Sequence, residues 1–278
     1  MTDNQINKKL MQVENLSFEY DSGGFALKDI SVDFLKGEKV AVIGSNGSGK
    51  STFFLNLNGV LHSHRGKIIY DGAEINKKNL NMLRSRVGIV FQEPDSQLIA
   101  STVEAEVSFG PLNLGLTEEE TEQRVAEALR EMNIEELKEK MVHYLSGGEK
   151  KRVSIADIIA MKPEIIIFDE PTASLDPLNC DMFEQTLKKM DDKNITVIIS
   201  THDIDFVWKW AERAIVFHDG EIIADGTPEQ IFIDDELLKK THLKKPTILE
   251  ICIILQEKNI VQNNQYVKSV SEFREMFK

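Results

Sequence analysis

The chain has little of three features that would point to particular classes of protein. It contains only two cysteines, Cys180 and Cys252, without metal-ligand spacing, so we expect reduced thiols in a cytosolic protein. Basic residues are scarce: 33 Lys and Arg against 46 Asp and Glu give a net charge of −13, which argues against non-specific nucleic-acid binding. No run approaches the ~20 apolar residues that cross a bilayer. If a membrane is involved, we expect it to be touched from outside.

The residues that are present predict strands alternating with helices. Apolar and polar residues alternate over 11–20, as in a half-exposed strand. The runs EIIIFDE (164–170) and TVIIS (196–200) are continuously apolar, which is typical of parallel strands covered on both faces. The segment 117–132 begins with Thr117 and Glu120 in capping-box spacing and continues with helical periodicity. The pattern predicts an α/β fold.

A glycine-rich loop follows the predicted strand 39–43. Residues 44–51 match G-x-x-x-x-G-K-S between an apolar strand and a helix. Glycines let backbone N–H groups converge on phosphate oxygens, and the helix N-terminus adds partial positive charge. Lys50 would neutralise the β- and γ-phosphates and the Ser51 hydroxyl would bind Mg²⁺. The sequence therefore predicts a nucleotide site formed by Gly44, Ser45, Asn46, Gly47, Ser48, Gly49, Lys50, Ser51 and Thr52.

An Asp-Glu pair ends the apolar run IIIFDE. At the end of a buried strand, the Asp169 carboxylate can hold Mg²⁺ directly or through water. We expect Glu170 to point elsewhere, because adjacent strand residues face opposite ways, which suits a general base on an attacking water. Such a pair is often only a turn, but the phosphate loop upstream favours the functional interpretation.

A second glycine-containing loop, YLSGGEKKR, spans 144–152. Ser146 and Glu149 have the spacing of an ordinary capping box. That explanation does not account for Gly147 and Gly148, because a glycine pair lowers helix stability. Bare backbone at this point is useful when another group must approach closely.

The segment LSGGE, one helix before IIIFDEPTASLD, resembles the signature of ABC-type ATPases over about residues 10–232. The resemblance implies a P-loop NTPase with a RecA-like core, an N-terminal antiparallel β subdomain and an inserted helical subdomain at about 92–161. It divides the chain into an ATP-binding domain (1–233) and a small C-terminal region (234–278). It also implies that Ser146, Gly147, Gly148 and Glu149 serve the γ-phosphate bound to a partner subunit, so that two chains dock head-to-tail around two ATPs.

Other family positions are matched residue by residue. The resemblance implies that Tyr20 stacks on adenine, that Gln92 senses the γ-phosphate and metal, and that His202 contacts the γ-phosphate. Mg²⁺ would be held by Ser51, Gln92 and Asp169. The loop crossing the dimer interface would be Ser174, Leu175 and Asp176.

The sequence FQEPDSQL (91–98), followed by STVEAEVSFGPLNLGL, resembles ATPases of energy-coupling-factor importers. This makes Asp95, Gln97 and Leu98 candidates for the surface that couples to a membrane scaffold. GPLNLGL and LSGGEKKR are most similar to the cobalt- or nickel-import ATPase subunit. Glu149 stands where many relatives have glutamine, and Ser45 where proline or histidine is common; we expect both to be tolerated. The implied partners are a second ATPase (an identical or a different chain) and membrane scaffold and substrate-specific subunits, without nucleic acid, at the cytoplasmic face of the membrane.

Several alternatives remain open from the sequence. They are a soluble ABC ATPase acting on nucleic acid or ribosomes, a vitamin-specific importer, a nucleotide-gated scaffold with little turnover, and a kinase, which would leave LSGGE unexplained. The pair of histidines in HSH (62–64) is more simply a surface feature than a metal site. Residues 234–278 could be an accessory domain, a dimer-stabilising arm or a helix packed onto its own domain.

Overall fold

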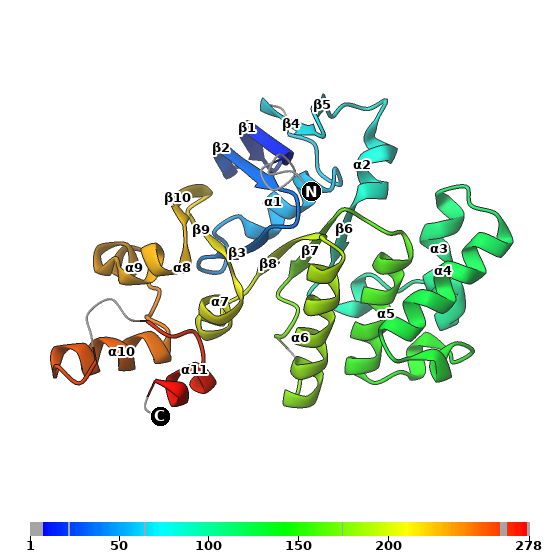
Figure 1. The fold of residues 1–278 in the computed structure, drawn as a ribbon. Coiled ribbons are helices and arrows are strands. Elements are labelled where there is room, and N and C mark those ends of the chain that lie inside the picture. Colours follow the sequence, from blue (N-terminus) through cyan, green and yellow to red (C-terminus); the bar gives the residue numbers. More distant parts are fainter. Residues whose placement is uncertain (1–7, 22, 64, 174, 262–265, 277–278) are drawn as a thin grey trace.

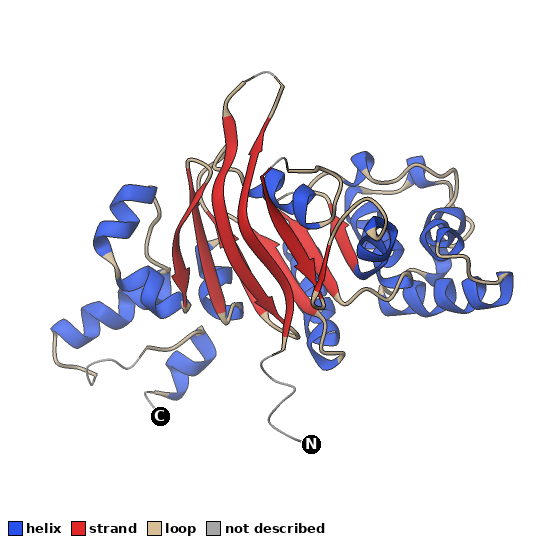
Figure 2. Cartoon of the chain, turned by 90° about the horizontal axis from the view of Figure 1, so that it is seen from above, coloured by secondary structure: helices blue, strands red, loops and turns tan. Residues whose placement is uncertain are grey.

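The computed structural model describes residues 8–21, 23–63, 65–173, 175–261 and 266–276. Two β-sheets lie in the middle of the molecule with helices on both sides (Figures 1 and 2). The strands are β1 (Lys9–Glu19), β2 (Phe25–Leu35), β3 (Lys39–Ile43), β4 (Arg65–Tyr70), β5 (Ala73–Glu74), β6 (Val87–Val90), β7 (Ile165–Asp169), β8 (Thr196–Ser200), β9 (Arg213–His218) and β10 (Glu221–Gly226).

Within the described ranges, the helical segments include three short 3-10 turns. These are Pro94–Ser96, Glu135–Leu137 and Val142–Tyr144. The α-helices are α1 (Lys50–Leu57), α2 (Leu80–Arg86), α3 (Val103–Asn113), α4 (Glu118–Glu131), α5 (Gly147–Ala160), α6 (Pro177–Asp192), α7 (Ile204–Trp210), α8 (Pro228–Ile233), α9 (Asp235–Thr241), α10 (Thr247–Glu257) and α11 (Val270–Glu275).

The larger sheet has the order β10-β9-β3-β8-β7-β6, and all its strands except β10 run parallel. This confirms the prediction of parallel strands from the two continuous apolar runs: Ile165–Phe168 of β7 and all of β8 are buried. Parallel strands bring their carboxyl ends to one edge. Ser200 at the end of β8 pairs with Val42 on one side and Asp169 on the other. The loops that follow β3, β7 and β8 therefore converge.

The smaller sheet is antiparallel, with the order β2-β1-β4-β5. Its inner face and the larger sheet enclose one apolar core around helix α1. Phe53 on α1 lies 5.2 Å from Phe217 on β9 and 6.3 Å from Phe34 on β2, measured between ring centroids. The start of α1, and with it the glycine-rich loop, is thus anchored from both sheets.

Helices α3, α4 and α5 form a separate group beside the sheets (Figure 1) and lie within the segment predicted to be helical, 92–161. The capping box predicted for α4 is confirmed: Glu120 N–H donates to Thr117 Oγ1 at 3.2 Å, and Thr117 N–H donates to Glu120 Oε2 at 3.0 Å. Val125 and Leu129 are buried on the inner face, as the periodicity indicates. These helices share an apolar core with β7, β8 and α6.

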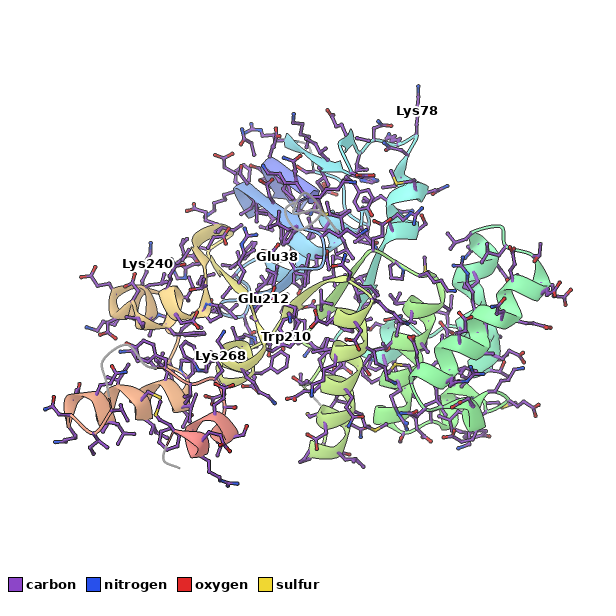
Figure 3. All side chains as sticks on the ribbon, in the orientation of Figure 1. Glu38, Lys78, Trp210, Glu212, Lys240 and Lys268 are labelled. Carbon is purple, nitrogen blue, oxygen red and sulfur yellow. The ribbon has the colours of Figure 1, made fainter. Side chains whose placement is uncertain are left out.

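The described residues of the C-terminal region, 234–278, pack onto their own domain. Of the three alternatives left open by the sequence, this is the helix packed onto its own domain. Trp208 on α7 is fully buried and its Nε1–H donates to Val267 C=O at 2.8 Å. Leu249 on α10 belongs to the same apolar cluster as Ile43 on β3. Figure 3 shows Lys240 and Lys268 of this region on the side of the molecule away from α3–α5. Across the described ranges, no helix combines the length and apolar character that membrane crossing requires.

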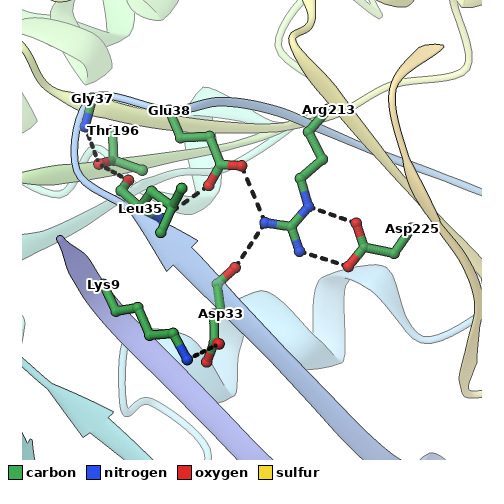
Figure 4. Close-up of polar contacts among 8 residues, drawn as sticks. All are labelled: Lys9, Asp33, Leu35, Gly37, Glu38, Thr196, Arg213 and Asp225. Carbon is green, nitrogen blue, oxygen red and sulfur yellow. Dashed lines mark hydrogen bonds and ion pairs between the residues drawn. The ribbon is translucent and has the colours of Figure 1, made fainter. Parts of the chain in front are cut away.

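A partly buried arginine, Arg213, joins the two sheets at the end opposite the converging loops (Figure 4). Arg213 on β9 makes a two-pronged ion pair with Asp225 on β10, at 2.5 Å for each N–O contact. Its third nitrogen donates to Asp33 C=O on β2 at 2.8 Å and to Glu38 Oε1 at 3.1 Å. The bond to Asp225 raises the pKa of Arg213, so the charge is permanent. This network fixes the smaller sheet against the larger one.

Candidate functional site

The loop between β3 and α1 has a backbone that only glycine can adopt at several points. Gly44 has φ +148°, and a Cβ there would lie 2.2 Å from Phe217 C=O. Gly49 has φ +106°, and a Cβ there would lie 2.6 Å from Ala26 C=O. Ser45, Asn46 and Gly47 are exposed on the outer side of the loop. The predicted phosphate loop is therefore a tight backbone turn open to solvent at the N-terminus of an eight-residue helix.

Lys50 is folded into this loop. Its side chain is 5% exposed, and Nζ donates to Gly44 C=O at 2.8 Å and Ser45 C=O at 3.1 Å. Burial lowers the pKa of Lys50, while the charges of Glu170 and Asp169 act in the opposite direction. Those carboxylates belong to the end of β7, so the three charged groups share one electrostatic environment. The neighbouring Ser48 Oγ is buried without a hydrogen-bond partner among the described residues.

Asp169 and Glu170 follow the sheet edge, and Ser200 organises both. Ser200 Oγ donates to Asp169 Oδ1 at 2.5 Å, and Glu170 N–H donates to Ser200 Oγ at 2.9 Å and Ser200 C=O at 3.1 Å. Glu170 lies one residue beyond β7 with φ +45°, in the left-handed region. The expected reason for its direction was wrong: a left-handed turn, rather than strand alternation, separates it from Asp169. Ser200 was not predicted from the sequence, although a polar residue ending an apolar strand is a usable signal.

Glu170 and His202 form a pair. His202 Nε2 lies 2.7 Å from Glu170 Oε1, with the histidine side chain 43% exposed and the glutamate 19% exposed. Asp203 accepts a hydrogen bond from Phe206 N–H and so caps α7, which fixes the segment after His202. A carboxylate with a histidine partner at the open edge of a sheet is a chemically competent arrangement for accepting a proton from water.

Tyr20 also reaches the loop. It follows β1 directly, and its hydroxyl lies 3.0 Å from Thr52 Oγ1 on α1. Its ring stands edge-on to Phe18 at 5.0 Å between centroids and is 42% exposed. An aromatic face next to the phosphate loop is available for stacking.

The predicted Mg²⁺ ligands have the right chemistry. Ser51, in the first turn of α1, and Gln92, two residues beyond β6, are exposed, and Asp169 keeps one oxygen clear of its bond to Ser200. Hydroxyl, amide and carboxylate oxygens suit a hard cation. No group of three or more His, Cys, Asp and Glu forms a metal-binding cluster in the described part of the chain, so the fit rests on this mixed oxygen set.

The second glycine loop begins α5. Ser146 is its N-cap, and the capping box with Glu149 is complete: Ser146 N–H donates to Glu149 Oε2 at 2.8 Å, and Glu149 N–H donates to Ser146 Oγ at 3.3 Å. A Cβ at Gly148 would lie 2.6 Å from the Asn179 side-chain amide, which would have to shift to make room. A Cβ at Gly147 would meet nothing within 4 Å. Among the described residues, no neighbour therefore requires a glycine at position 147.

The predicted interface loop lies beside this helix. Ser174 falls outside the described residues. Leu175 packs partly buried against the helical core, and Asp176 caps α6 by accepting from Asn179 N–H at 2.9 Å. Asn179 is the residue that approaches Gly148, so the interface loop and the start of α5 are neighbours.

The three residues predicted to form a coupling surface differ in placement. The Asp95 side chain is 73% exposed and pairs with Lys150 at 2.6 Å. Gln97 instead binds α5: its Nε2 donates to Ser154 C=O at 2.8 Å and Asp157 Oδ2 at 3.2 Å. Leu98 is only 9% exposed and belongs to the helical core, which corrects its expected surface position. The turn at Pro94–Ser96 continues into a Leu98 N–H to Pro94 C=O bond, and this coil places Leu98 inside.

The buried carboxyl of Asp157 gives a testable pH dependence. Burial raises the pKa of Asp157 to about 7, and the Glu106 charge adds to this while the bond from Gln97 opposes it. An unfolded Asp titrates near ~4, so between about pH 4 and pH 7 the folded chain binds more protons than the unfolded chain. The free energy of unfolding should therefore fall as pH rises through this window.

We predict that Asp157→Asn removes this loss, because an amide oxygen can still accept from Gln97 and carries no charge. Stability at pH 8 should rise by roughly 1–3 kcal/mol, with almost no change at pH 4. Urea unfolding followed by circular dichroism at both pH values measures the difference. Asp181→Asn, at an exposed position on α6, serves as the matched control. An equal effect at both pH values would show that folding does not raise the pKa of Asp157.

Comparisons with known proteins identify the family of this chain and agree with its fold. The family model described as ABC transporter matches residues 27–173. The energy-coupling factor transporter ATP-binding protein EcfA of Methanocaldococcus jannaschii is 45% identical over 252 residues, which covers 90% of each chain. Among solved structures, cbiO1 from Clostridium perfringens, part of the ABC transporter complex cbiONQ, is 40% identical with a TM-score of 0.74, covering 89% of this chain and 99% of that one.

A dimeric ATP-binding cassette, MJ0796, in a post-hydrolysis state bound to ADP and Pi, is 30% identical with a TM-score of 0.71 and covers 79% of this chain and 99% of that one. The family match spans more than half of the chain, and the related structures share the fold described above. This chain therefore belongs to the ABC transporter family, as one of its ATP-hydrolysing subunits.

Proposed function

We propose that this chain is the ATPase subunit of an energy-coupling-factor importer, and that the imported cargo is cobalt or nickel ions. The observation that supports it best is the convergence of Lys50, Asp169, Glu170 and His202 at the carboxyl edge of the parallel sheet. The likeness to EcfA and to cbiO1 supports the importer class. The proposal of a metal cargo rests on the resemblance of GPLNLGL and LSGGEKKR to the cobalt- or nickel-import ATPase subunit. Membrane subunits would select the ion, so this chain need not bind it.

Each site residue has a role in this proposal. Lys50 and the loop amides hold the β- and γ-phosphates, Tyr20 stacks on adenine, and Glu170 accepts the proton of the attacking water. His202 holds Glu170 through their 2.7 Å contact and also faces the γ-phosphate. Bound Mg²⁺ would supply charge neutralisation at the phosphates, and Ser51, Gln92 and Asp169 are the residues that would hold it.

A second subunit completes each pocket in the proposal. Ser146 and Gly147 present an N–H-rich helix start that no residue of this chain covers among those described, while Leu175 and Asp176 lie beside it. A two-fold pairing places the helix start of one chain over the phosphate loop of the other. The dimer sits peripherally at the cytoplasmic face of the membrane, with Asp95 and the 73% exposed Ile99 nearest a scaffold partner.

The importer and its cargo are tested together in membranes. A tagged chain is expressed from its native genome, solubilised gently, and its co-purifying subunits are identified. Vesicles holding that complex should take up radioactive Co²⁺ or Ni²⁺ on ATP addition, and vesicles made with Lys50→Met should not. Co-purification with ribosomes or DNA instead of membrane subunits would refute the importer assignment. ATP-dependent uptake of a vitamin without uptake of either metal would refute only the cargo.

A further inference from the structure

Lys151 is a buried amine that the proposed reaction does not use. It is 3% exposed on α5, and its Nζ donates to Phe91 C=O at 2.7 Å and Gln92 C=O at 3.1 Å. Burial lowers its pKa to about 8, against the opposing charges of Glu93 and Asp169. Burying an ammonium group is costly unless its hydrogen bonds are satisfied, so the two carbonyl contacts are what hold it in place.

The loop that contains Gln92 is fastened to α5 at further points on the same helix face. Gln97 Oε1 accepts from Phe91 N–H at 3.3 Å, and its Nε2 donates to Ser154 C=O at 2.8 Å. Asp95 pairs with Lys150 at 2.6 Å. The α5 residues that the Gln92 loop contacts are 150, 151, 154 and 157, which have the spacing of one helical face. The loop therefore lies along two turns of α5.

Helix α5 begins at the residue offered to the partner subunit. Ser146 is the N-cap of α5, and Lys151 lies in the next turn. A hydrogen-bonded α-helix moves as a rigid element over so short a distance. A displacement of the Gln92 loop that pulls on Lys151 therefore displaces Ser146 as well.

We propose that Lys151 is a positioning residue that joins the Gln92 loop and α5 into one body, so that nucleotide contact at Gln92 in one pocket sets the position of Ser146 in the other. The inference rests on the proposed function, because it assumes that Ser146 serves a partner's nucleotide. Lys151 touches no reacting atom in this scheme. Its contribution is geometric, and a misplacement of about 1 Å can lower a rate by as much as ~10².

Two substitutions at Lys151 distinguish the effect of its hydrogen-bond donor from the effect of its side-chain size. Lys151→Met keeps the length and apolar stem but removes the donor from two partly buried carbonyls. Lys151→Gln keeps an N–H₂ group and should restore part of the contact. Lys189→Met is the matched control, because Lys189 Nζ also donates to a backbone carbonyl of another helix, Glu131 C=O at 2.7 Å. Lys189 lies on α6 and is exposed.

For the full-length protein, Lys151→Met should lower kcat for ATP hydrolysis about 10-fold with KM for ATP changed less than about 2-fold. Lys151→Gln should recover part of that loss, and Lys189→Met should match wild type. A Lys151→Met enzyme with wild-type kcat would overturn the proposal. So would a loss shared equally by Lys189→Met, since that would indicate general destabilisation.

Hydrogen exchange provides a readout that needs no turnover. Lys151→Met should speed exchange of the Phe91 and Gln97 amides and also of the Ser146 and Glu149 amides, because both segments lose a common anchor. Faster exchange in the loop alone would show that α5 does not move with it and would refute the coupling. Because this measurement is made without ATP, its result is independent of whether the chain proves to drive an importer.

Mixed dimers made from differently tagged chains test separately whether Lys151→Met impairs the pocket that uses the variant's Ser146 and the pocket that uses the variant's Gln92. When a chain carrying Lys151→Met and Glu170→Gln pairs with wild type, the working pocket uses the variant's Ser146 and a wild-type Gln92. When a Lys151→Met chain pairs with a Glu170→Gln chain, the working pocket uses the variant's Gln92 and an unaltered Ser146. Both should turn over several-fold more slowly than wild type paired with Glu170→Gln. A loss in only one arrangement would refute a joint role.

Discussion

Replacing Glu170 by glutamine is expected to slow ATP hydrolysis by about 10²–10³-fold while ATP still binds with nearly wild-type affinity. The amide keeps the size of the carboxylate and can still contact His202, but it cannot accept a proton from water. Lys50 and the loop amides, which hold the phosphates, lie on another segment of the chain and are unchanged. Because ATP is bound and not cleaved, the variant should accumulate as a closed dimer with nucleotide trapped inside.

Single-turnover kinetics measure the rate of ATP hydrolysis, and gel filtration with Mg·ATP measures the accumulation of the closed dimer. Glu184→Gln is the matched control, since Glu184 is a partly exposed carboxylate paired with Lys209 at 2.6 Å and has no role in the proposed reaction. A Glu170→Gln enzyme that turns over at the control rate would remove Glu170 from the role of general base. A variant that fails to bind ATP would mean that the carboxylate orders the phosphate loop.

The backbone at Glu170 gives independent support for a functional role. A glutamate with φ +45° is in the left-handed region, which costs about 1 kcal/mol or more relative to extended backbone. The two hydrogen bonds from its N–H to Ser200 hold this conformation. Local strain of this kind persists where the geometry it creates is needed, here a carboxylate turned away from Asp169 and towards His202.

The strands and the phosphate loop were predictable because local sequence determines them. A continuous apolar run such as 165–168 can only be accommodated between two covering layers, and its parallel partners bring their ends together. The glycines at Gly44 and Gly49 are required locally by their positive φ angles, whereas the carbonyls that a Cβ there would meet belong to distant segments of the chain. The capping boxes at Thr117 and Ser146 need only two side chains three residues apart.

The parts that were missed depend on contacts between distant segments. Leu98 reads as a loop residue, but a coil after Pro94 turns it into a core supplied by helices much later in the chain. Lys151 reads as one more basic residue in EKKR, and nothing local shows that two carbonyls of the Gln92 loop will meet it. Sequence patterns report which face of an element is apolar, whereas these residues are defined by what packs against that face.

Two inactive variants are expected to restore activity when mixed, and this result depends on the pocket being shared between chains. Lys50→Met removes phosphate binding from its own pocket and leaves Ser146 intact. Ser146→Arg blocks the helix start offered to a partner and leaves Lys50 intact. Each homodimer contains two defective pockets, so each should fall to about one hundredth of wild-type activity or less. A mixed dimer contains one pocket with both defects and one pocket with neither.

Random pairing at a 1:1 ratio makes half of the dimers mixed, and each has one of two pockets intact, so activity should return to about one quarter of wild type. Pairing Lys50→Met with a Lys50→Met, Ser146→Arg double variant is the control, because no intact pocket can form. Activity should also rise with more than first-order dependence on protein concentration near the dissociation constant. If the mixture stays as inactive as the control while both chains pair normally by gel filtration, then Ser146 serves the nucleotide of its own chain. In that case the head-to-tail arrangement is wrong.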